Sequence, residues 1–302
     1  MPINKDLPLK NYPFTIKWDE KATTKFINAL DGIRVDLVDC PTREQLKSYI
    51  PSYSQATWED KPRNDYTEKE REDCIRDLFQ FKVLPTAHET VNFTFLISNI
   101  DLIDVTHLIR HRTMSFSAHC TGDRDLRHDD VLIKPSIEES PYAEDYKSLV
   151  RQCKDLYAMM VDDMGISICD ARTILPRSSV NHYYARVNLR DFVGFLKQRL
   201  DRQIQPESDN IIALKMLIEV AKVFPEIKYS IDLYAPDQWF IKTAPLDKST
   251  NLYQPEPRNN IFDWHPQWFI YPRQREEMTG GQQFMELWEP LVQTYEDLTD
   301  DD

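Results

Sequence analysis

A histidine lies between two arginines near the middle of the chain, in the run Arg110-His111-Arg112. A guanidinium group presents several N–H donors in one plane, and this geometry matches the oxygens of a phosphate group. Small hydroxyl-bearing residues, a cysteine and a glycine turn follow before the next arginine, Arg124. These residue types in this order predict a site for a multiply charged, planar anion.

A second basic segment lies downstream, from Arg172 to Arg199. The 302-residue chain has a formal net charge of −13, which argues against nucleic acid or an anionic membrane as a ligand of the whole surface. Basic segments in an acidic chain instead favour a small anionic ligand. The alternative is that the arginines form only surface ion pairs, with Asp170 and Asp201 as neighbours, and such pairs are individually weak. We interpret the two segments as halves of one site for a nucleotide and a cofactor.

Several classes of protein are excluded by what the chain lacks. Its five cysteines are scattered without a Cys-x-x-Cys pair, so we expect neither a zinc ribbon nor a redox dithiol, and no metal site. No Gly-x-Gly-x-x-Gly or Walker sequence occurs, so a dinucleotide would not be held as in a Rossmann or P-loop fold. No signal peptide follows Met1 and no apolar run approaches ~20 residues. We therefore expect a soluble cytoplasmic protein, in the host cytoplasm if it is viral.

The spacing of apolar residues predicts an α+β fold with long helices and a small sheet. A capping box, in which Thr67 is followed three residues later by Glu70, begins a helix over 67–81. Helical spacing predicts the other helices, at 19–30, 102–109, 142–164, 182–203, 211–224 and 274–296. Alternating apolar residues predict strands at 14–17, 32–40 and 84–97. Two stretches rich in proline are predicted to be irregular, namely 41–63 and 225–273.

Four motifs in order resemble the flavin-dependent thymidylate synthases, the ThyX family. The family signature is Arg-His-Arg, then seven residues, then Ser; here the seven residues after Arg112 are followed by Cys120. The other three motifs read Thr86-Ala-His-Glu89-x3-Phe93-Thr-Phe95, Ala171-Arg172-x-x-Leu175-Pro176 and Asn188-x-Arg190-x4-Phe195-Leu196-x-x-Arg199. The resemblance covers about residues 65–225, which we take as the catalytic core. Residues 1–64 would then be an N-terminal extension with the first core elements, and residues 226–302 a C-terminal extension ending in a helix.

The resemblance implies an activity, its cofactors and an assembly. A ThyX enzyme transfers a one-carbon unit from methylenetetrahydrofolate to C5 of dUMP, and FAD reduces this unit to the methyl group of dTMP after NADPH has reduced the flavin. Such chemistry depends on the cofactors, while the protein supplies binding, orientation and charge. The family forms homotetramers whose sites lie where subunits meet, so we expect the same here.

The resemblance also assigns roles to individual residues. Arg199 matches the arginine set against the pyrimidine ring, where a fixed guanidinium would stabilise charge on the ring oxygens as C5 becomes nucleophilic. Arg172 matches an arginine on the nucleotide phosphate. The matched flavin contacts are Thr86, Arg110, His111, Arg112, Asn188 and Arg190. The remaining matches to the nucleotide pocket are His107, Cys120, Thr121, Gly122 and Arg124. Cations beside His111 should lower its pKa and keep its ring neutral.

The departures from the family pattern cluster in the nucleotide pocket. Cys120 replaces the signature serine, Ala118 a glutamate and His107 a glutamine, while Gly194 replaces a polar flavin contact. Either Cys120 is a small polar lining residue with Arg124 on the phosphate, or its thiolate is a nucleophile that adds to C6 of the pyrimidine.

Three functional hypotheses follow. The first is a reductive methylase that converts dUMP to dTMP. The second is a hydroxymethylase of dUMP or dCMP that serves nucleotide or DNA modification. The third is a non-catalytic relative that binds flavin or nucleotide.

Overall fold

The computed structural model describes residues 22–56, 60–200, 208–234 and 281–300. The strand predicted at 14–17 and most of the stretch after Pro225 lie outside these ranges. Within them the chain combines helices with small sheets, which confirms the α+β prediction.

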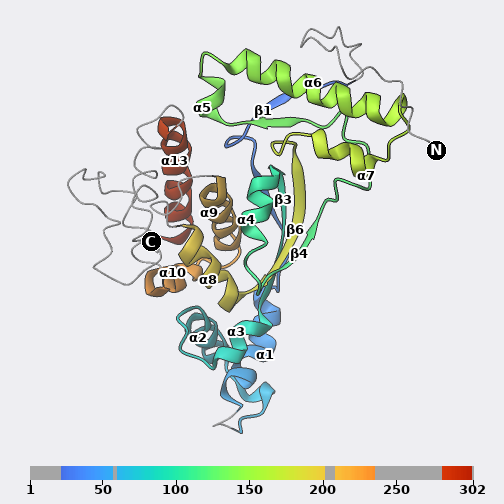
Figure 1. The fold of residues 1–302 in the computed structure, drawn as a ribbon. Helices are drawn as coiled ribbons and strands as arrows, with labels where there is room; N and C mark the ends of the chain where they lie inside the picture. The colour runs from blue at the N-terminus through green and yellow to red at the C-terminus, as the bar shows by residue number, and fades with distance from the viewer. Residues whose placement is uncertain (1–21, 57–59, 201–207, 235–280, 301–302) are drawn as a thin grey trace, which may run out of the picture.

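A four-stranded antiparallel sheet lies at the centre of the molecule (Figure 1). Its strand order is β2 (Arg34–Asp39), β3 (Asn92–Ile100), β6 (Asn181–Asn188) and β4 (Ser115–Ala118). Successive side chains of a strand point to opposite faces, and Phe93, Phe95 and Ile97 of β3 are buried on one of them. Only that face therefore belongs to the main core.

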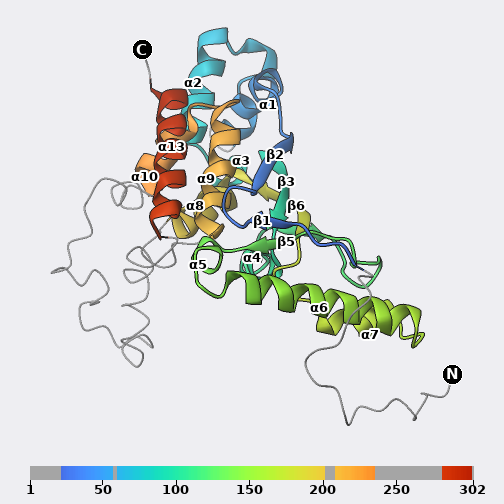
Figure 2. The same ribbon diagram turned by 90° about the horizontal axis from the view of Figure 1, so that it is seen from above.

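Helices cover the buried face in two layers. The inner layer holds α4 (Leu102–Leu108), α8 (Leu189–Arg199) and α9 (Ser208–Ala221), and the outer one α10 (Ile227–Tyr234) and α13 (Gly281–Thr299), as Figures 1 and 2 show. α9 packs on the sheet and on α13 at once. This explains why α9 is buried along nearly its whole length, since a helix that is apolar all round needs cover on all sides.

The remaining elements extend from the two ends of this core (Figures 1 and 2). One end carries α1 (Arg43–Gln55), α2 (Glu68–Phe79), α3 (Pro85–Thr90) and the 3₁₀ turn Arg63–Asp65. The other end carries β1 (Phe26–Asn28), β5 (Val131–Ile133), α5 (Pro135–Glu138), α6 (Ala143–Asp162), α7 (Ile168–Ala171) and the 3₁₀ turn Arg172–Ile174. β1 and β5 pair in parallel as a separate small sheet.

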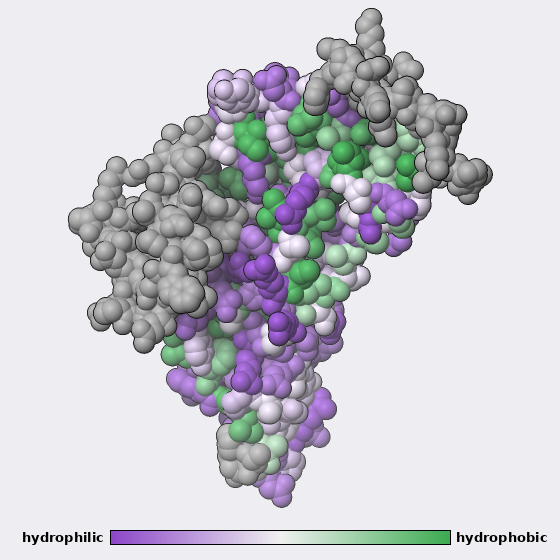
Figure 3. Space-filling view, in the orientation of Figure 1, coloured by the Kyte–Doolittle hydropathy of each residue, from purple (hydrophilic) through white to green (hydrophobic). Residues whose placement is uncertain are grey.

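The end that carries α6 exposes apolar side chains. Tyr142, just before α6, is 71% exposed, and Leu149 within it is 59% exposed. In Figure 3 hydrophobic residues gather in the upper part of the face, near this end, whereas hydrophilic residues dominate the lower part. None of the helices in the described ranges is long and apolar enough to span a bilayer.

Most predicted helices are confirmed. α2, α4, α6 and α9 match the predictions for 67–81, 102–109, 142–164 and 211–224, and α13 matches the last predicted helix over its described part. The capping box of Thr67 and Glu70 is formed, and β2 confirms the strand at 32–40. The strand predicted at 84–97 begins later, because Pro85 occupies the first position of α3, where proline is well tolerated.

Four predictions were wrong for identifiable reasons. The stretch after Pro225 was predicted to be irregular, but its described start is α10, whose buried residues pack against α8 and α2. The helix predicted at 19–30 is replaced over its described part by β1, which pairs with β5 instead. The predicted loop at 41–63 contains α1, where Thr42 and Gln45 form a capping box and only Pro51 interrupts the helical pattern. The first part of the helix predicted at 182–203 is β6. This strand pairs with β3 on one side and β4 on the other, and every second residue in it is buried.

Gly194, in the middle of α8, offers a test of this description of the helix. A Cβ atom added there would meet no atom within 4 Å, so Gly194→Ala should stabilise the helix by about 0.5–1 kcal/mol. Denaturant unfolding of the two proteins measures this difference. Gly32→Ala is the matched control and should destabilise the fold, because its Cβ would lie 2.8 Å from the Asn28 carbonyl oxygen. An unchanged or lower stability of Gly194→Ala would contradict the description.

Candidate active site

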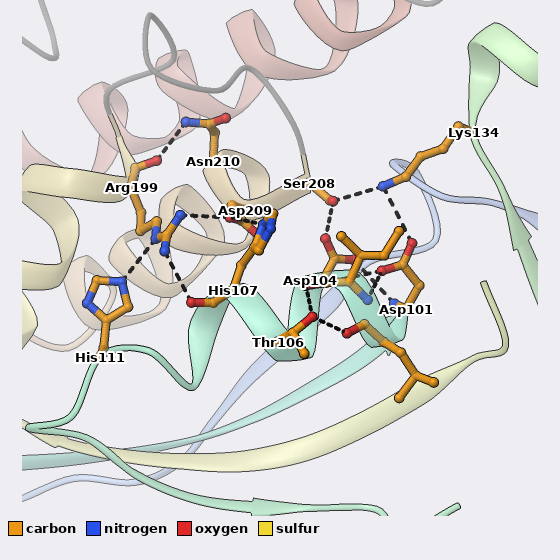
Figure 4. A network of polar contacts seen from close by, with 12 residues as sticks. Asp101, Asp104, Thr106, His107, His111, Lys134, Arg199, Ser208, Asp209 and Asn210 are labelled. Atoms are coloured by element: carbon orange, nitrogen blue, oxygen red, sulfur yellow. Dashed lines mark hydrogen bonds and ion pairs between the residues drawn. The ribbon is translucent and has the colours of Figure 1, made fainter. Parts of the chain in front are cut away.

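Arg199, the last residue of α8, is held by three groups from other elements (Figure 4). Its Nε donates a hydrogen bond to His111 Nε2 at 3.0 Å, and its Nη1 donates to Asp209 Oδ2 at 2.8 Å. Its Nη2 donates to the carbonyl oxygen of His107 at 3.2 Å. The second basic segment therefore meets the Arg-His-Arg segment, as predicted. Asp209 is thus a carboxylate that orients Arg199. Asp201, the acidic neighbour named from the sequence, lies outside the described residues.

The first turn of α9 joins this cluster to α4. Ser208, Asp209 and Asn210 are all buried. Asn210 Nδ2 donates to the carbonyl oxygen of Arg199 at 2.7 Å, and the Ser208 hydroxyl donates to the carboxylate of Asp104 in α4. Three consecutive residues therefore fix the end of α8 against α4 (Figure 4).

His111 is neutral in this arrangement. Burial and the Arg199 guanidinium lower its pKa to about 4. Because Nε2 accepts the hydrogen bond from Arg199, the ring proton of the neutral form must reside on Nδ1. The prediction of a neutral ring is confirmed, but the causes are burial and Arg199 rather than the flanking Arg110 and Arg112. Those two side chains are exposed and make no ion pair within the described parts of the chain.

The buried carboxyl group beside this cluster is strongly perturbed. Burial raises the pKa of Asp104 to about 7, and the nearby Asp101 and Asp209 act in the same direction. Lys134 and the hydrogen bond from Ser208 partly oppose this rise. Asp101 itself caps α4 by accepting from the backbone N–H groups of residues 103 and 104. A buried carboxyl group favours its protonated form unless nearby cations offset the cost of burying its charge.

A second cluster forms around Arg172. Its Nη1 donates to Thr121 Oγ1 at 3.0 Å, and its Nε donates to the carbonyl oxygen of Cys169 at 3.1 Å. Gly122 is required at this contact, since a Cβ there would lie 2.8 Å from Nη1 of Arg172. The pairing of Arg172 with Thr121 and Gly122 agrees with their predicted place in one pocket.

The two cysteines of this cluster both contact Gly122. Its backbone N–H lies 3.4 Å from the sulfur of Cys120, and its carbonyl oxygen lies 3.3 Å from the sulfur of Cys169. Both thiols are free and exposed. Cys169 was not among the predicted site residues, and only its position three residues before Arg172 could have indicated it. Arg124 donates to Asp129 at 3.0 Å, so its guanidinium is engaged by a carboxylate of its own chain.

The two clusters lie at opposite ends of β4. His111 precedes the strand and Thr121 follows it, and four extended residues span roughly 10 Å or more. One chain thus carries the Arg199 cluster and the Arg172 cluster at separate places, and each cluster combines residues from both basic segments.

The predicted flavin contacts outside the Arg-His-Arg run lie on α3 and α8. Thr86 is exposed in the first turn of α3, and Arg190 forms an ion pair with Glu89 at 2.8 Å. Asn188 caps α8 by accepting from the backbone N–H of Asp191 at 2.9 Å. Between these helices is a hollow of about 350 Å³, lined by Phe81, Pro85, His88, Arg190, Val193, Gly194, Lys197 and Tyr234.

The lining of this hollow combines rings with cations. The Phe81 ring stacks on His88 with centroids 4.1 Å apart, and Tyr234 meets Phe81 edge-on at 4.7 Å. Phe81 has a φ of +56°, a left-handed conformation that is strained for an aromatic residue and is often found at functional sites. Aromatic walls beside Arg190 and Lys197 suit a ligand with a planar ring and a phosphate group. The residues present thus fit a dinucleotide cofactor.

The family model for thymidylate synthase complementing protein (Thy1) matches residues 42–226 of the chain. The chain belongs to this family. It is a divergent ThyX protein, as the four motifs indicated, because its identity to relatives in the family is modest.

Three relatives are each named flavin-dependent thymidylate synthase. The Geobacter sulfurreducens protein is 28% identical over 156 residues, which cover 49% of this chain and 66% of the relative. The Nitratidesulfovibrio vulgaris protein is 29% identical over 161 residues, covering 49% and 65%. The Pyrococcus horikoshii protein is 31% identical over 150 residues, covering 47% and 61%. The chain therefore spans just under two thirds of each relative's length.

Solved structures show the same fold. A UMP/dUMP methylase, PolB from Streptomyces cacaoi bound with 5-Br dUMP, superposes with a TM-score of 0.55 at 21% identity, covering 69% of this chain and 98% of PolB. Its structure with 5-Br UMP gives a TM-score of 0.51 at 21% identity, covering 70% and 97%. Nearly all of PolB has a counterpart here, so the additional residues belong to this chain.

No group of three or more His, Cys, Asp or Glu side chains is placed to hold a metal ion within the described ranges. The acidic side chains near Arg199 instead face cations and backbone donors.

Gly122→Ala is predicted to weaken binding of a nucleotide monophosphate. The added methyl group would displace Arg172 from Thr121, and loss of a charged hydrogen bond costs about 1.5–3 kcal/mol, or roughly 10- to 100-fold in affinity. The displaced atoms are the end of a flexible side chain, so stability should change by less than about 1 kcal/mol. Calorimetric titration with dUMP measures the effect. Unchanged affinity would remove Arg172 from the ligand site.

Asp104 predicts a pH dependence of stability. Its pKa of about 7 in the folded chain exceeds the ordinary value of about 3.9, so between these values the folded state binds more protons than the unfolded state. The free energy of unfolding contributed by this group therefore falls as the pH rises from about 4 to about 7.

Asp104→Asn should flatten this slope, because the amide keeps an acceptor for the Asp101 N–H and carries no proton equilibrium. Denaturant unfolding at about pH 5 and about pH 8 measures the difference. The exposed Asp39→Asn is the control and should keep the slope of the parent chain. A slope in Asp104→Asn equal to that of the parent chain would contradict this prediction, since it would show that the carboxyl group is already ionised in the folded state over this pH range.

Proposed function

We propose that this protein transfers a one-carbon unit from methylenetetrahydrofolate to C5 of a pyrimidine deoxynucleotide, with dUMP converted to dTMP. Membership of the ThyX family supports this activity, and the held guanidinium of Arg199 is the observation that carries it. If water rather than hydride adds to the transferred methylene group, the product is a hydroxymethyl nucleotide, and Cys120, an exposed thiol near Arg172, favours this second possibility.

Arg199 would stabilise the pyrimidine ring during transfer. Its Nη1 and Nη2 are directed by Asp209 and by the His107 carbonyl, while Nε is engaged by His111. A guanidinium fixed in advance needs no reorganisation when negative charge develops on the ring oxygens, and such preorganised donors lower the barrier most. His107, whose ring is 25% exposed, would contact the same nucleotide.

The flavin would occupy the hollow between α3 and α8 and reach the Arg-His-Arg segment. When bound and reduced by NADPH, the flavin would supply the hydride that completes the methyl group. Arg190, Lys197 and the hydroxyl of Thr86 would hold the phosphates, since each lies on or beside the hollow. Arg110 and Arg112 are exposed and would contact the flavin from their own loop, with Asn188 fixing the start of α8.

The nucleotide phosphate would bind at the second cluster, to Arg172, Thr121 and the Gly122 turn. Because this cluster and Arg199 lie at opposite ends of β4, one nucleotide would bridge clusters of neighbouring protomers. The exposed apolar residues near α6 support such an assembly, since exposed apolar patches mark interaction surfaces. We infer a homotetramer acting in the cytoplasm.

Product analysis tests this proposal. The purified full chain is incubated with dUMP or dCMP, methylenetetrahydrofolate, FAD and NADPH, and the nucleotide is analysed by mass spectrometry. The expected product is dTMP, formed with consumption of NADPH. A hydroxymethylated nucleotide without NADPH consumption would replace reduction by the second possibility. A flavin-containing protein that releases no tritium from C5-labelled nucleotide would overturn the enzymatic proposal.

Arg199→Lys gives this assay its matched variant. A lysine cannot present the planar fork of donors, so product formation should fall by about 100-fold, the loss typical of a misplaced catalytic group. Arg186→Lys is the control, because Arg186 is exposed and its side chain contacts Asp39 and Thr94 rather than a residue of either cluster. Equal rates for the two variants would remove Arg199 from the chemistry.

A further inference from the structure

One buried carboxylate oxygen contacts two side chains of the candidate active site. Oδ2 of Asp209 lies 2.8 Å from Nη1 of Arg199 and 3.3 Å from Nδ1 of His107. The Asp209 side chain is only 2% exposed, whereas those of Arg199 and His107 are 18% and 25% exposed. The carboxylate therefore lies behind the two groups that reach the surface of the site (Figure 4).

The position of Asp209 is fixed by its neighbours in the chain. Ser208 on one side is bonded to Asp104 of α4, and Asn210 on the other side is bonded to the Arg199 carbonyl of α8. Lys134 also donates to the Ser208 hydroxyl at 3.0 Å. The carboxylate cannot shift without breaking contacts to both helices, so it can impose a direction on whatever it binds.

We propose that Asp209 is a positioning residue that orients Arg199 and His107 together toward the pyrimidine ring. It holds the guanidinium where Nε reaches His111, and it favours the His107 tautomer with the proton on Nδ1, which leaves Nε2 for a ligand. Only the effect on the substrate rests on the proposed function. The orientation of the two side chains stands on the contacts of the folded chain.

The charge of Asp209 matters as well as its shape. Arg199 is mostly buried, and a buried cation that loses its counter-ion is strongly destabilised. In Asp209→Asn the amide oxygen is neutral, so the guanidinium gains free energy by turning toward water. His111 then loses the cation beside its ring.

The titration of His111 distinguishes positioning from a merely structural role. The groups that face His111 are Arg199 and Phe195 from α8, with Asp209 and His107 behind Arg199 and with Arg110 and Arg112 beside it in the chain. In the parent protein its pKa is about 4. If Arg199 turns away in Asp209→Asn, this pKa rises toward the ordinary value of about 6.5. If Arg199 stays, loss of the negative charge lowers it further.

We would therefore measure the His111 pKa by NMR in the full chain and in Asp209→Asn. The proposal predicts a rise, with kcat reduced by about 100-fold and the Kd for dUMP changed by less than about threefold, within 0.7 kcal/mol. Asp209→Glu, which keeps the charge, should recover part of both losses. Asp155→Asn is the control: Asp155 is buried and accepts from the Ala22 N–H at 3.0 Å, so its loss should leave the His111 pKa unchanged. An unchanged or lower His111 pKa in Asp209→Asn would overturn the proposal.

A measurement on the parent protein covers the case in which Asp209→Asn does not fold. ¹⁵N relaxation of the Arg199 Nε–H should give an order parameter near the ~0.85 of rigid backbone. A value below about 0.6 would show a guanidinium that is free to turn, and would contradict the proposal. Neither NMR result depends on catalysis, so a protein that transfers no carbon would overturn the proposed function alone.

Discussion

The ion pair between Arg199 and Asp209 is the interaction on which the rest of the candidate site depends. Removing two charges from water is costly, and the cost is recovered only when further hydrogen bonds satisfy both partners. Here the guanidinium donates further hydrogen bonds to His111 and to the His107 carbonyl, and Oδ2 of Asp209 also contacts Nδ1 of His107. The pair thereby joins the end of α8, the start of α9 and α4 into one rigid unit. The buried face of the central sheet supports this unit from behind.

This rigidity accounts for the electrostatic character of the site. Arg199 keeps His111 neutral, and the Arg-His-Arg segment therefore presents two cations and a neutral ring rather than three positive charges. The cluster around Arg172 lies at the other end of β4. Gly122 leaves room there for the Arg172 guanidinium, which donates to Thr121. Each chain thus holds the Arg199 cluster, which suits a pyrimidine ring, apart from the Arg172 cluster, which suits a phosphate. An assembly of several chains is the simplest way to bring both groups to one nucleotide.

Much of the site could be predicted from the sequence, because its arginines lie in short motifs with fixed spacing. Arg172 and Arg199 were identified in this way, and the structure brings them to Thr121 and His111 respectively. Asp209 could not be predicted, since it belongs to α9 and meets Arg199 only through the packing of α9 against α8. The nearest acidic residue in sequence, Asp201, lies outside the described residues.

The fold shows the same division between local and distant determinants. Capping boxes and helical spacing are local signals, so α2, α4, α6 and α9 were predictable. The sequence predicts a helix over β6 because β6 continues without a break into α8, and only its pairing with β3 and β4 makes it a strand. α1 was missed because Pro51 lies within it. The cover of α9 by α13 depends on residues far apart in the chain, which no local pattern reveals.

A crystal structure of the full chain with FAD and dUMP would test the central claim most directly. The account predicts that the pyrimidine ring lies within hydrogen-bonding distance of Arg199, still paired with Asp209, while the phosphate is bound by Arg172 of the partner subunit. A nucleotide bound with its ring away from Arg199, or an Arg199 that has left Asp209, would contradict it.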